Sequence, residues 1–173
     1  MKRLFVLAAF VFIAAIAANA QNKANFAGSW SLDKSKSQGL DQRLADVDVT
    51  WTITQDDSKI TIESKVSGGQ APAGGGGGRG PGGPRTYTLD GKEVTTEGGG
   101  QMGGTNTTKA TWSGDGKTLE LNSVRAGSFN GQDFKSTSTD KMSLSGDGKV
   151  LTVVRHSESP RGTTDSTWVL NKQ

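Results

Sequence analysis

The sequence predicts an all-β fold, an antiparallel up-and-down meander of about 8–10 strands closing into a barrel, with at most one short helix. Apolar and polar residues alternate with period two from Val49 onward, as in strands with one buried face. A turn Asp-Gly-Lys recurs between such segments. The pattern Trp-x-Leu-Asp/Asn-Lys occurs near the start of the predicted mature chain, at Trp30, and again at its end, at Trp168. This bracketing indicates that the first and last strands are neighbours.

The first 20 residues have the features of a secretory signal peptide. Lys2 and Arg3 precede an apolar run that ends at Ala18-Asn19-Ala20, a small-x-small cleavage pattern. The run is shorter than a membrane-spanning helix needs, so an uncleaved anchor is the weaker alternative. We therefore predict a signal peptide over 1–20 and one domain over 21–173, secreted or periplasmic and not inserted in a membrane after cleavage.

The net charge and the lack of cysteine argue against several classes of function. The formal charge is +3, from 20 basic and 17 acidic residues, and it falls to +1 when Lys2 and Arg3 leave with the signal peptide. A nearly balanced chain lacks the basic surface that nucleic-acid binding requires, so no nucleic-acid partner is expected. The chain has no cysteine, which excludes disulfides, thiolate metal sites and a cysteine nucleophile.

The expected strands begin at residues 28–32. The only candidate helix follows at 38–48, where Leu40, Leu44 and Val47 have i, i+4, i+7 spacing, although its length and its glycine allow only a turn or two. A hairpin is then expected, with strands at 49–54 and 59–66 and a polar turn between them. Its inward residues would be Val49, Trp51, Ile53, Ile60, Ile62 and Val66.

Three further hairpins are expected around Asp90-Gly91, Asp115-Gly116 and Asp147-Gly148, because glycine supplies the positive φ of a tight turn. Strands over 132–144 and 163–170 complete the meander. Such a sheet exposes unpaired backbone at both edges unless it closes. Closure would pair the first strand with the last, so that Trp30 and Trp168 both help to plug one end of the barrel.

Two segments are too rich in glycine to form regular structure, and we expect flexible loops at 67–84 and 98–105. Arg79 and Arg85 give the first loop a likeness to RNA-binding Arg-Gly segments, but it lacks interleaved aromatic residues. The loops are interpreted either as tolerated surface insertions or as a lid at an open barrel mouth.

The opening motif Phe26-Ala27-Gly28-Ser29-Trp30 resembles the F-x-G-x-W motif of lipocalins and the wider calycin group, which includes fatty-acid-binding-type barrels. With Trp168 these residues form the expected fold signature. The longer pattern of Asp-Gly-Lys hairpins resembles secreted bacterial lipocalin-like proteins of no established activity. The resemblance implies a glycine turn into the first strand and a tryptophan across the closed end. It also implies an arginine stacked on that tryptophan, for which Arg155 is the first candidate and Arg125 the second.

A barrel of this strand number is wider than its own side chains readily fill, so we predict a small amphipathic ligand in the interior. The expected apolar wall is Trp51, Tyr87 and Trp112, and the expected polar anchor is Arg125 or Arg155. Small polar side chains should also face inward, near Ser136, Ser138, Thr164 and Ser166. A flattened, filled barrel is the alternative that the residues leave open.

The leading hypothesis is therefore a non-enzymatic binding protein without metal or cofactor. A second hypothesis is a cell-envelope interaction module that contacts a protein or a glycan through its outer face and glycine-rich loops. A hydrolase is the least favoured, since His156 is the only histidine and no serine lies in a nucleophile-elbow motif. A Ser-His-Asp set would need His156 and Asp165. The oligomeric state is left open.

Overall fold

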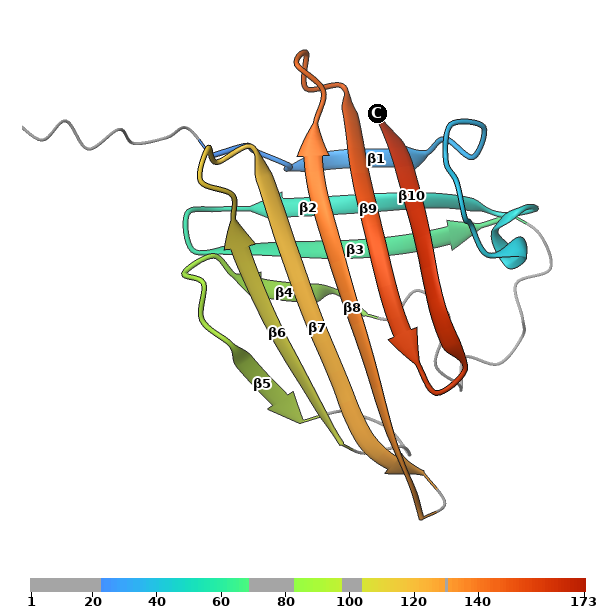
Figure 1. Ribbon diagram of the computed structural model, residues 1–173. Coiled ribbons are helices and arrows are strands. Elements are labelled where there is room, and N and C mark those ends of the chain that lie inside the picture. The colour runs from blue at the N-terminus through green and yellow to red at the C-terminus, as the bar shows by residue number, and fades with distance from the viewer. Residues whose placement is uncertain (1–22, 69–82, 98–103, 130) are drawn as a thin grey trace, which may run out of the picture.

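The computed structural model contains ten strands in one antiparallel sheet, which curls into a nearly closed barrel (Figure 1). The structure describes residues 23–68, 83–97, 104–129 and 131–173. The predicted signal peptide and most of both predicted glycine-rich loops lie outside these residues. The strands are β1 (Gly28–Leu32), β2 (Asp48–Gln55), β3 (Lys59–Ser67), β4 (Arg85–Thr88), β5 (Val94–Glu97), β6 (Thr105–Trp112), β7 (Thr118–Phe129), β8 (Gln132–Leu144), β9 (Val150–Ser159) and β10 (Gly162–Lys172).

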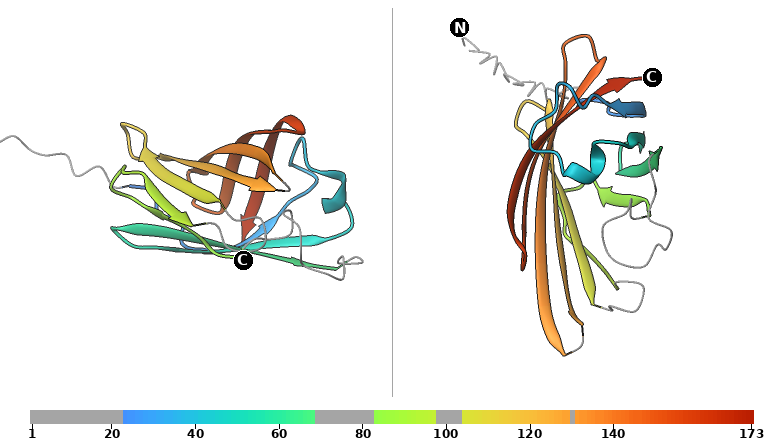
Figure 2. Two further views of the ribbon diagram at one scale, coloured as in Figure 1. Left: turned by 90° about the horizontal axis from the view of Figure 1, so that it is seen from below. Right: turned by 90° about the vertical axis from the view of Figure 1, so that its right-hand side faces the viewer.

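The predicted meander is confirmed, including the pairing of the first strand with the last. The hairpin expected around Asp90-Gly91 is wrong, because β4 before this turn pairs with β3 and β5 after it pairs with β6. The strand order is β4-β3-β2-β1-β10-β9-β8-β7-β6-β5, so the first strand pairs with the last. The sheet ends at β4 and β5, which are not paired with each other among the described residues. Strands β1–β4 cross β6–β10 at a steep angle and form a second layer facing them (Figures 1 and 2). The core lies between these two layers.

The repeated pattern at the two ends of the chain pairs with itself. Leu32 lies opposite Leu170, and Trp30 lies opposite Lys172 in the β1–β10 register. The Asn171 side chain donates to Asp33 Oδ2 at 3.1 Å, and Lys172 Nζ lies 5.3 Å from the centre of the Trp30 ring. Each half of the pattern thus supplies partners for the other half, which explains why the same short pattern brackets the domain.

The candidate helix is reduced to one 3-10 turn, η1 (Gln42–Leu44). Asp41 caps this turn by accepting from the Arg43 backbone N–H at 3.0 Å. Leu40, Leu44 and Val47 are partly buried against the core. Their spacing therefore identified an apolar segment that packs, but nucleation is too costly for a longer helix in so short a segment.

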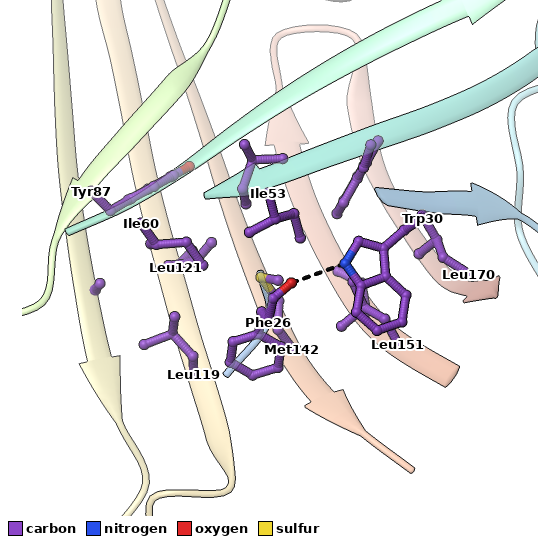
Figure 3. Packing of buried hydrophobic residues seen from close by; sticks show 14 of the residues in the cluster. Phe26, Trp30, Ile53, Ile60, Tyr87, Leu119, Leu121, Met142, Leu151 and Leu170 are labelled. Carbon is purple, nitrogen blue, oxygen red and sulfur yellow. Dashed lines mark hydrogen bonds between the residues drawn. The ribbon is translucent and has the colours of Figure 1, made fainter. Parts of the chain in front are cut away.

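Apolar side chains fill one end of the barrel, which we call the closed end; it contains the β6–β7 and β8–β9 turns. Phe26, Trp30, Leu119, Met142 and Leu151 have no exposed surface there (Figure 3). Trp30 Nε1 donates to the Phe26 carbonyl oxygen at 2.9 Å, so the ring is held by a hydrogen bond as well as by packing. The opposite end, which contains the β7–β8 and β9–β10 turns, is called the open end.

The segment before β1 ties the two layers together at the closed end. The Ala24 N–H donates to the Gly116 carbonyl in the β6–β7 turn, at 2.9 Å. Gln55, at the end of β2, accepts from the Phe26 N–H and donates to the Ala24 carbonyl. Phe26 consequently lies between the layers, where its ring stacks on Trp112 with centroids 6.0 Å apart. This is the closed end that the F-x-G-x-W motif implied.

The prediction that Trp30 and Trp168 together plug one end of the barrel is wrong for Trp168. Trp168 lies four residues before Lys172, the residue opposite Trp30, and its ring packs on Trp51, with centroids 5.6 Å apart. The cation over Trp30 is Lys172 rather than Arg155 or Arg125. Arg155 stacks on Trp168 instead, at 5.0 Å.

No helix among the described residues is long and apolar enough to cross a membrane.

Candidate functional site

The inner face of β6–β10 changes from apolar to polar in successive rows of residues that lie opposite one another across the strands. Of the rows that cross all five strands, the one nearest the closed end is entirely apolar, and the next contains a buried ion pair. The third row carries only hydroxyl groups, and beyond it lie Arg125 and its neighbours. From the closed end, the three rows that cross all five strands are Trp112-Leu119-Met142-Val153-Trp168, Ala110-Leu121-Asp140-Arg155-Ser166 and Thr108-Ser123-Ser138-Ser157-Thr164. The shorter apolar row Leu144-Leu151-Leu170 lies still nearer to the closed end.

The ion pair joins Asp140 on β8 to Arg155 on β9. Arg155 Nε donates to Asp140 Oδ1 and its terminal nitrogen to Oδ2, both at 2.6 Å. The Asp140 side chain is 3 % exposed and the Arg155 side chain 20 %. Two parallel, charge-assisted hydrogen bonds of this kind fix the orientation of both side chains. Burial alone opposes the charge on Arg155, but the hydrogen bonds to Asp140 raise its pKa above the ordinary value.

The opposite layer adds a second guanidinium and an aromatic wall. Arg85 on β4 lies 3.7 Å from Asp140 Oδ2 and 5.9 Å from the centre of the Trp51 ring. Trp51 is also faced by Arg155, at 6.0 Å, and it packs on Trp168. Two arginines that share one carboxylate therefore both lie within about 6 Å of one tryptophan ring, an arrangement that cation-π attraction stabilises.

Tyr87 completes this layer from β4. It is buried, and desolvation raises the pKa of its phenol, with Asp140 contributing in the same direction. Its polar neighbour is Ser123, the hydroxyl-row residue of β7. The phenol is therefore neutral at ordinary pH, and it offers the interior a hydroxyl group rather than a charge.

The structure brings together three of the five predicted ligand-binding residues, Trp51, Tyr87 and Arg155. Trp112 lies apart from them, stacked on Phe26 at the closed end. Arg125 is further toward the open end of β7, where its guanidinium lies 5.8 Å from the centre of the Phe134 ring. The expected inward face of Ser136, Ser138, Thr164 and Ser166 agrees with the register of β8–β10.

Sequence reasoning missed Asp140 and Arg85. Asp140 lies two residues from Met142 and from Ser138, so period two already places it on the inner face. A buried carboxylate then requires a cationic partner, and Arg155 was the available candidate. Arg85 gave a weaker signal, because it directly follows the glycine-rich segment and its strand has only four residues.

A second candidate site lies on the outer face of β8–β10. It is a hollow of about 420 Å³ bounded by Gln38 and Gly39 and floored by Val154. Here His156 Nδ1 lies 2.6 Å from Asp165 Oδ1, so the structure does bring together two members of the conceivable Ser-His-Asp set. The hydroxyl opposite His156 belongs to Thr139, and it donates to Asn122 instead. The His156–Asp165 pair thus has no hydroxyl hydrogen-bonded to it among the described residues, and the other cations of the hollow, Lys141 and Arg155, pair with Glu120 and Asp140.

The single histidine allows the outer pair to be tested by NMR. Asp165, and secondarily Glu158, raise the pKa of His156 above its ordinary value. A raised folded-state pKa means that the favourable interaction is present at low pH and is lost as the pH rises through that pKa. We expect Asp165→Asn to lower the pKa of His156, followed as one titrating ring-proton signal, and Glu158→Gln to lower it less. A larger effect of Glu158→Gln would contradict the stated ranking of the two carboxylates.

Among the described residues, no group of three or more histidine, aspartate or glutamate side chains is placed to hold a metal ion.

No protein-family model and no curated protein matches the sequence. A search of solved structures found a crystal structure of zebrafish ileal bile acid-binding protein complexed with cholic acid. It has 16% sequence identity and a TM-score of 0.48, over 86% of this chain and 98% of that chain. This similarity is too low to assign the chain to a family.

Proposed function

We propose that the chain is a secreted or periplasmic, non-enzymatic protein that binds a small amphipathic anion inside the open half of the barrel. The observation that carries the proposal is an excess of positive charge on the inner face. Arg85, Arg125 and Arg155 face inward in this half, against the single carboxylate of Asp140 among the described strand residues. An excess of buried or half-buried charge is costly unless an opposite charge joins it.

The three arginines are not equivalent. Arg155 is held by both oxygens of Asp140, so it serves as part of the wall. Arg125 is half-buried on the inner face, and no carboxylate lies within ion-pair distance of it among the described residues. Arg85 is 37 % exposed and only 3.7 Å from the shared carboxylate. Arg125 and Arg85 are therefore the two anchors available to an anionic group, which refines the prediction of Arg125 or Arg155.

The apolar part of a ligand has a surface nearby. Trp51 and Trp168 pack together at the level of the ion pair, and Val49 and Val66 turn inward from β2 and β3. Aromatic side chains give a large contact area, and burial of apolar ligand surface contributes about 25 cal/mol per Å². A molecule with one anionic group and an apolar body would use both features.

The test compares dodecanoate with dodecyltrimethylammonium, which have the same alkyl chain and opposite charge, by isothermal titration calorimetry. We expect the anion to bind more tightly, and Arg125→Gln to weaken its binding at least about tenfold, the value of a lost charge-assisted hydrogen bond. Arg161→Gln is the matched control, because Arg161 is exposed in the β9–β10 turn. Equal binding of the two amphiphiles, or equal effects of the two substitutions, would overturn the proposal.

A further inference from the structure

Two polar side chains flank Arg125 on the inner face of the sheet. Asn106 on β6 and Ser136 on β8 both lie directly opposite Arg125 on β7, and we call these three residues the Arg125 row. The row lies next to the hydroxyl row, on its open-end side. Ser136 is two residues from Ser138 of the hydroxyl row, and residues two apart share one face of a strand. Opposed side chains have Cβ atoms about 5 Å apart, so all three can contact one group of a ligand.

The Arg125 row makes few interactions within the protein. Among the residues that the structure describes, no hydrogen bond and no ion pair engages the side chain of Asn106, Arg125 or Ser136. The guanidinium faces only the ring of Phe134, with 5.8 Å to its centre. All three side chains of the row are half-buried, so solvent reaches them but they are not spread over the outer surface. Their hydrogen-bonding capacity is therefore available to a ligand inside the barrel.

Ser138 adds another hydroxyl group from the neighbouring row. Its Oγ reaches Asp140 Oδ1 only at 3.5 Å, whereas a good O–H···O bond is about 2.7 Å long. The Arg125 row and the hydroxyl row contain no carboxylate. Asp140 lies two rows from Arg125, which is about 13 Å along a strand. One guanidinium, one amide and two hydroxyl groups are thus gathered where no carboxylate of these rows neutralises the charge.

This group of donors is larger than a carboxylate needs. Within the same sheet, Arg155 alone engages both oxygens of the Asp140 carboxylate, through two parallel hydrogen bonds. A phosphate or sulfate ester instead has three terminal oxygens that point in three directions. One or two of them can accept from Arg125 while the third accepts from Asn106 or from a serine hydroxyl. Each added hydrogen bond to an anionic oxygen is stronger than one between neutral groups.

We infer that the anionic group of the ligand is a tetrahedral oxyanion, a phosphate or sulfate ester on an apolar body, bound by Arg125 together with Asn106, Ser136 and Ser138. This inference rests on the proposed function and specifies the chemical class of the anionic group. The two esters share the tetrahedral arrangement of oxygens on which the argument depends.

Isothermal titration calorimetry of the full domain tests the inference with octyl sulfate, octyl phosphate, octanoate and inorganic phosphate, each below any micellar concentration. Octyl sulfate and octanoate have similar alkyl chains and the same single negative charge, so the comparison isolates the geometry of the anionic group. We expect octyl sulfate to bind at least about tenfold more tightly, the effect of one additional charge-assisted hydrogen bond. Octyl phosphate should also bind more tightly than octanoate, and its affinity relative to octyl sulfate shows which ester is preferred.

A double variant, Asn106→Ala with Ser136→Ala, should remove the preference for octyl sulfate while octanoate still binds through Arg125. The matched control is Asn122→Ala with Ser143→Ala, which changes the same residue types on outward positions of β7 and β8. The control should keep the preference of the unmodified protein. Circular dichroism and urea unfolding of both double variants establish that any lost affinity does not come from lost folding.

The outcomes separate this inference from the proposed function. If octanoate binds as tightly as octyl sulfate, or if the inner and outer double variants behave alike, the tetrahedral class is wrong and anion binding stands. If inorganic phosphate binds as tightly as octyl phosphate, the apolar body contributes nothing and an ester ligand is excluded. If none of the compounds binds, the proposed function fails and this inference fails with it.

Discussion

Replacing Asp140 with alanine is expected to destabilise the protein by about 3–5 kcal/mol, because the substitution leaves the Arg155 guanidinium buried without its counter-ion. Asp140 is 3 % exposed and makes both short hydrogen bonds to Arg155. It is also the nearest carboxylate to Arg85. The loss should lie toward the lower end of the range, because the Arg155 side chain keeps 20 % of its surface exposed. Urea unfolding, followed by tryptophan fluorescence and by circular dichroism, measures it.

Asp165→Ala is the matched control. Asp165 also pairs with a basic side chain on β9, at 2.6 Å, but its own side chain is 77 % exposed. Solvent screens such a pair, so its removal should cost far less than removal of Asp140. A double variant, Asp140→Leu with Arg155→Met, should recover most of the stability, since it removes both charges at once. Similar losses in the two single aspartate variants would refute the view that Asp140 neutralises a buried charge.

Features of the site that depend on residues close together in the chain could be predicted from the sequence, whereas contacts between distant segments could not. Period two assigned Trp51, Ser138 and Ser166 to the inner face, because strand alternation is a local property of the chain. The hairpin turns were equally local, and the repeated pattern supplied the pairing of β1 with β10. These features were enough to predict the pairing of the first strand with the last, but the Asp90-Gly91 turn, expected to close a hairpin, joins β4 and β5, which do not pair with each other among the described residues.

The contacts across the barrel could not be predicted in this way. Arg85 meets Asp140 because β4 faces β8 in the folded barrel, and no periodicity encodes that approach. The same holds for Trp112, which was expected beside Trp51 but lies in the apolar row next to the closed end, stacked on Phe26. Trp112 and Trp168 lie in the same row of the sheet, yet their rings pack on different partners, Phe26 and Trp51. Only the packing of the folded barrel therefore distinguishes the tryptophan of the closed end from the one beside the ion pair.

The rows also divide the barrel between residues that stabilise the fold and residues assigned to the proposed binding of a ligand. Toward the closed end, fully buried side chains such as Leu119 and Leu151 supply the hydrophobic stabilisation of the fold. Toward the open end, Ser138 and Arg125 contribute little burial but leave polar groups accessible. Substitutions at the closed end should therefore affect stability most, whereas substitutions beyond the ion pair should affect ligand affinity with smaller effects on folding.

Trp30→Ala is the substitution that tests this division most directly, and we expect it to destabilise the protein by about 3–5 kcal/mol. Trp30 has no exposed surface, donates to the Phe26 carbonyl and is covered by Lys172. Its removal leaves a large cavity between the layers and frees the segment that ties β2 to the β6–β7 turn. Because small domains are stable by only about 5–15 kcal/mol, much of the free energy of unfolding would be lost.

Trp168→Ala removes the tryptophan at the equivalent position of the repeated pattern. Urea unfolding of the two variants compares the stability that each tryptophan contributes. Trp168 is only partly buried, and its ring covers Trp51 and Arg155 rather than the closed end. Its loss should cost less stability than the loss of Trp30, while opening the wall beside the ion pair and lowering the affinity for an amphipathic anion. If Trp168→Ala proves the more destabilising of the two, the closed end is not the main source of stability, and the division of the barrel into a structural half and a binding half is wrong.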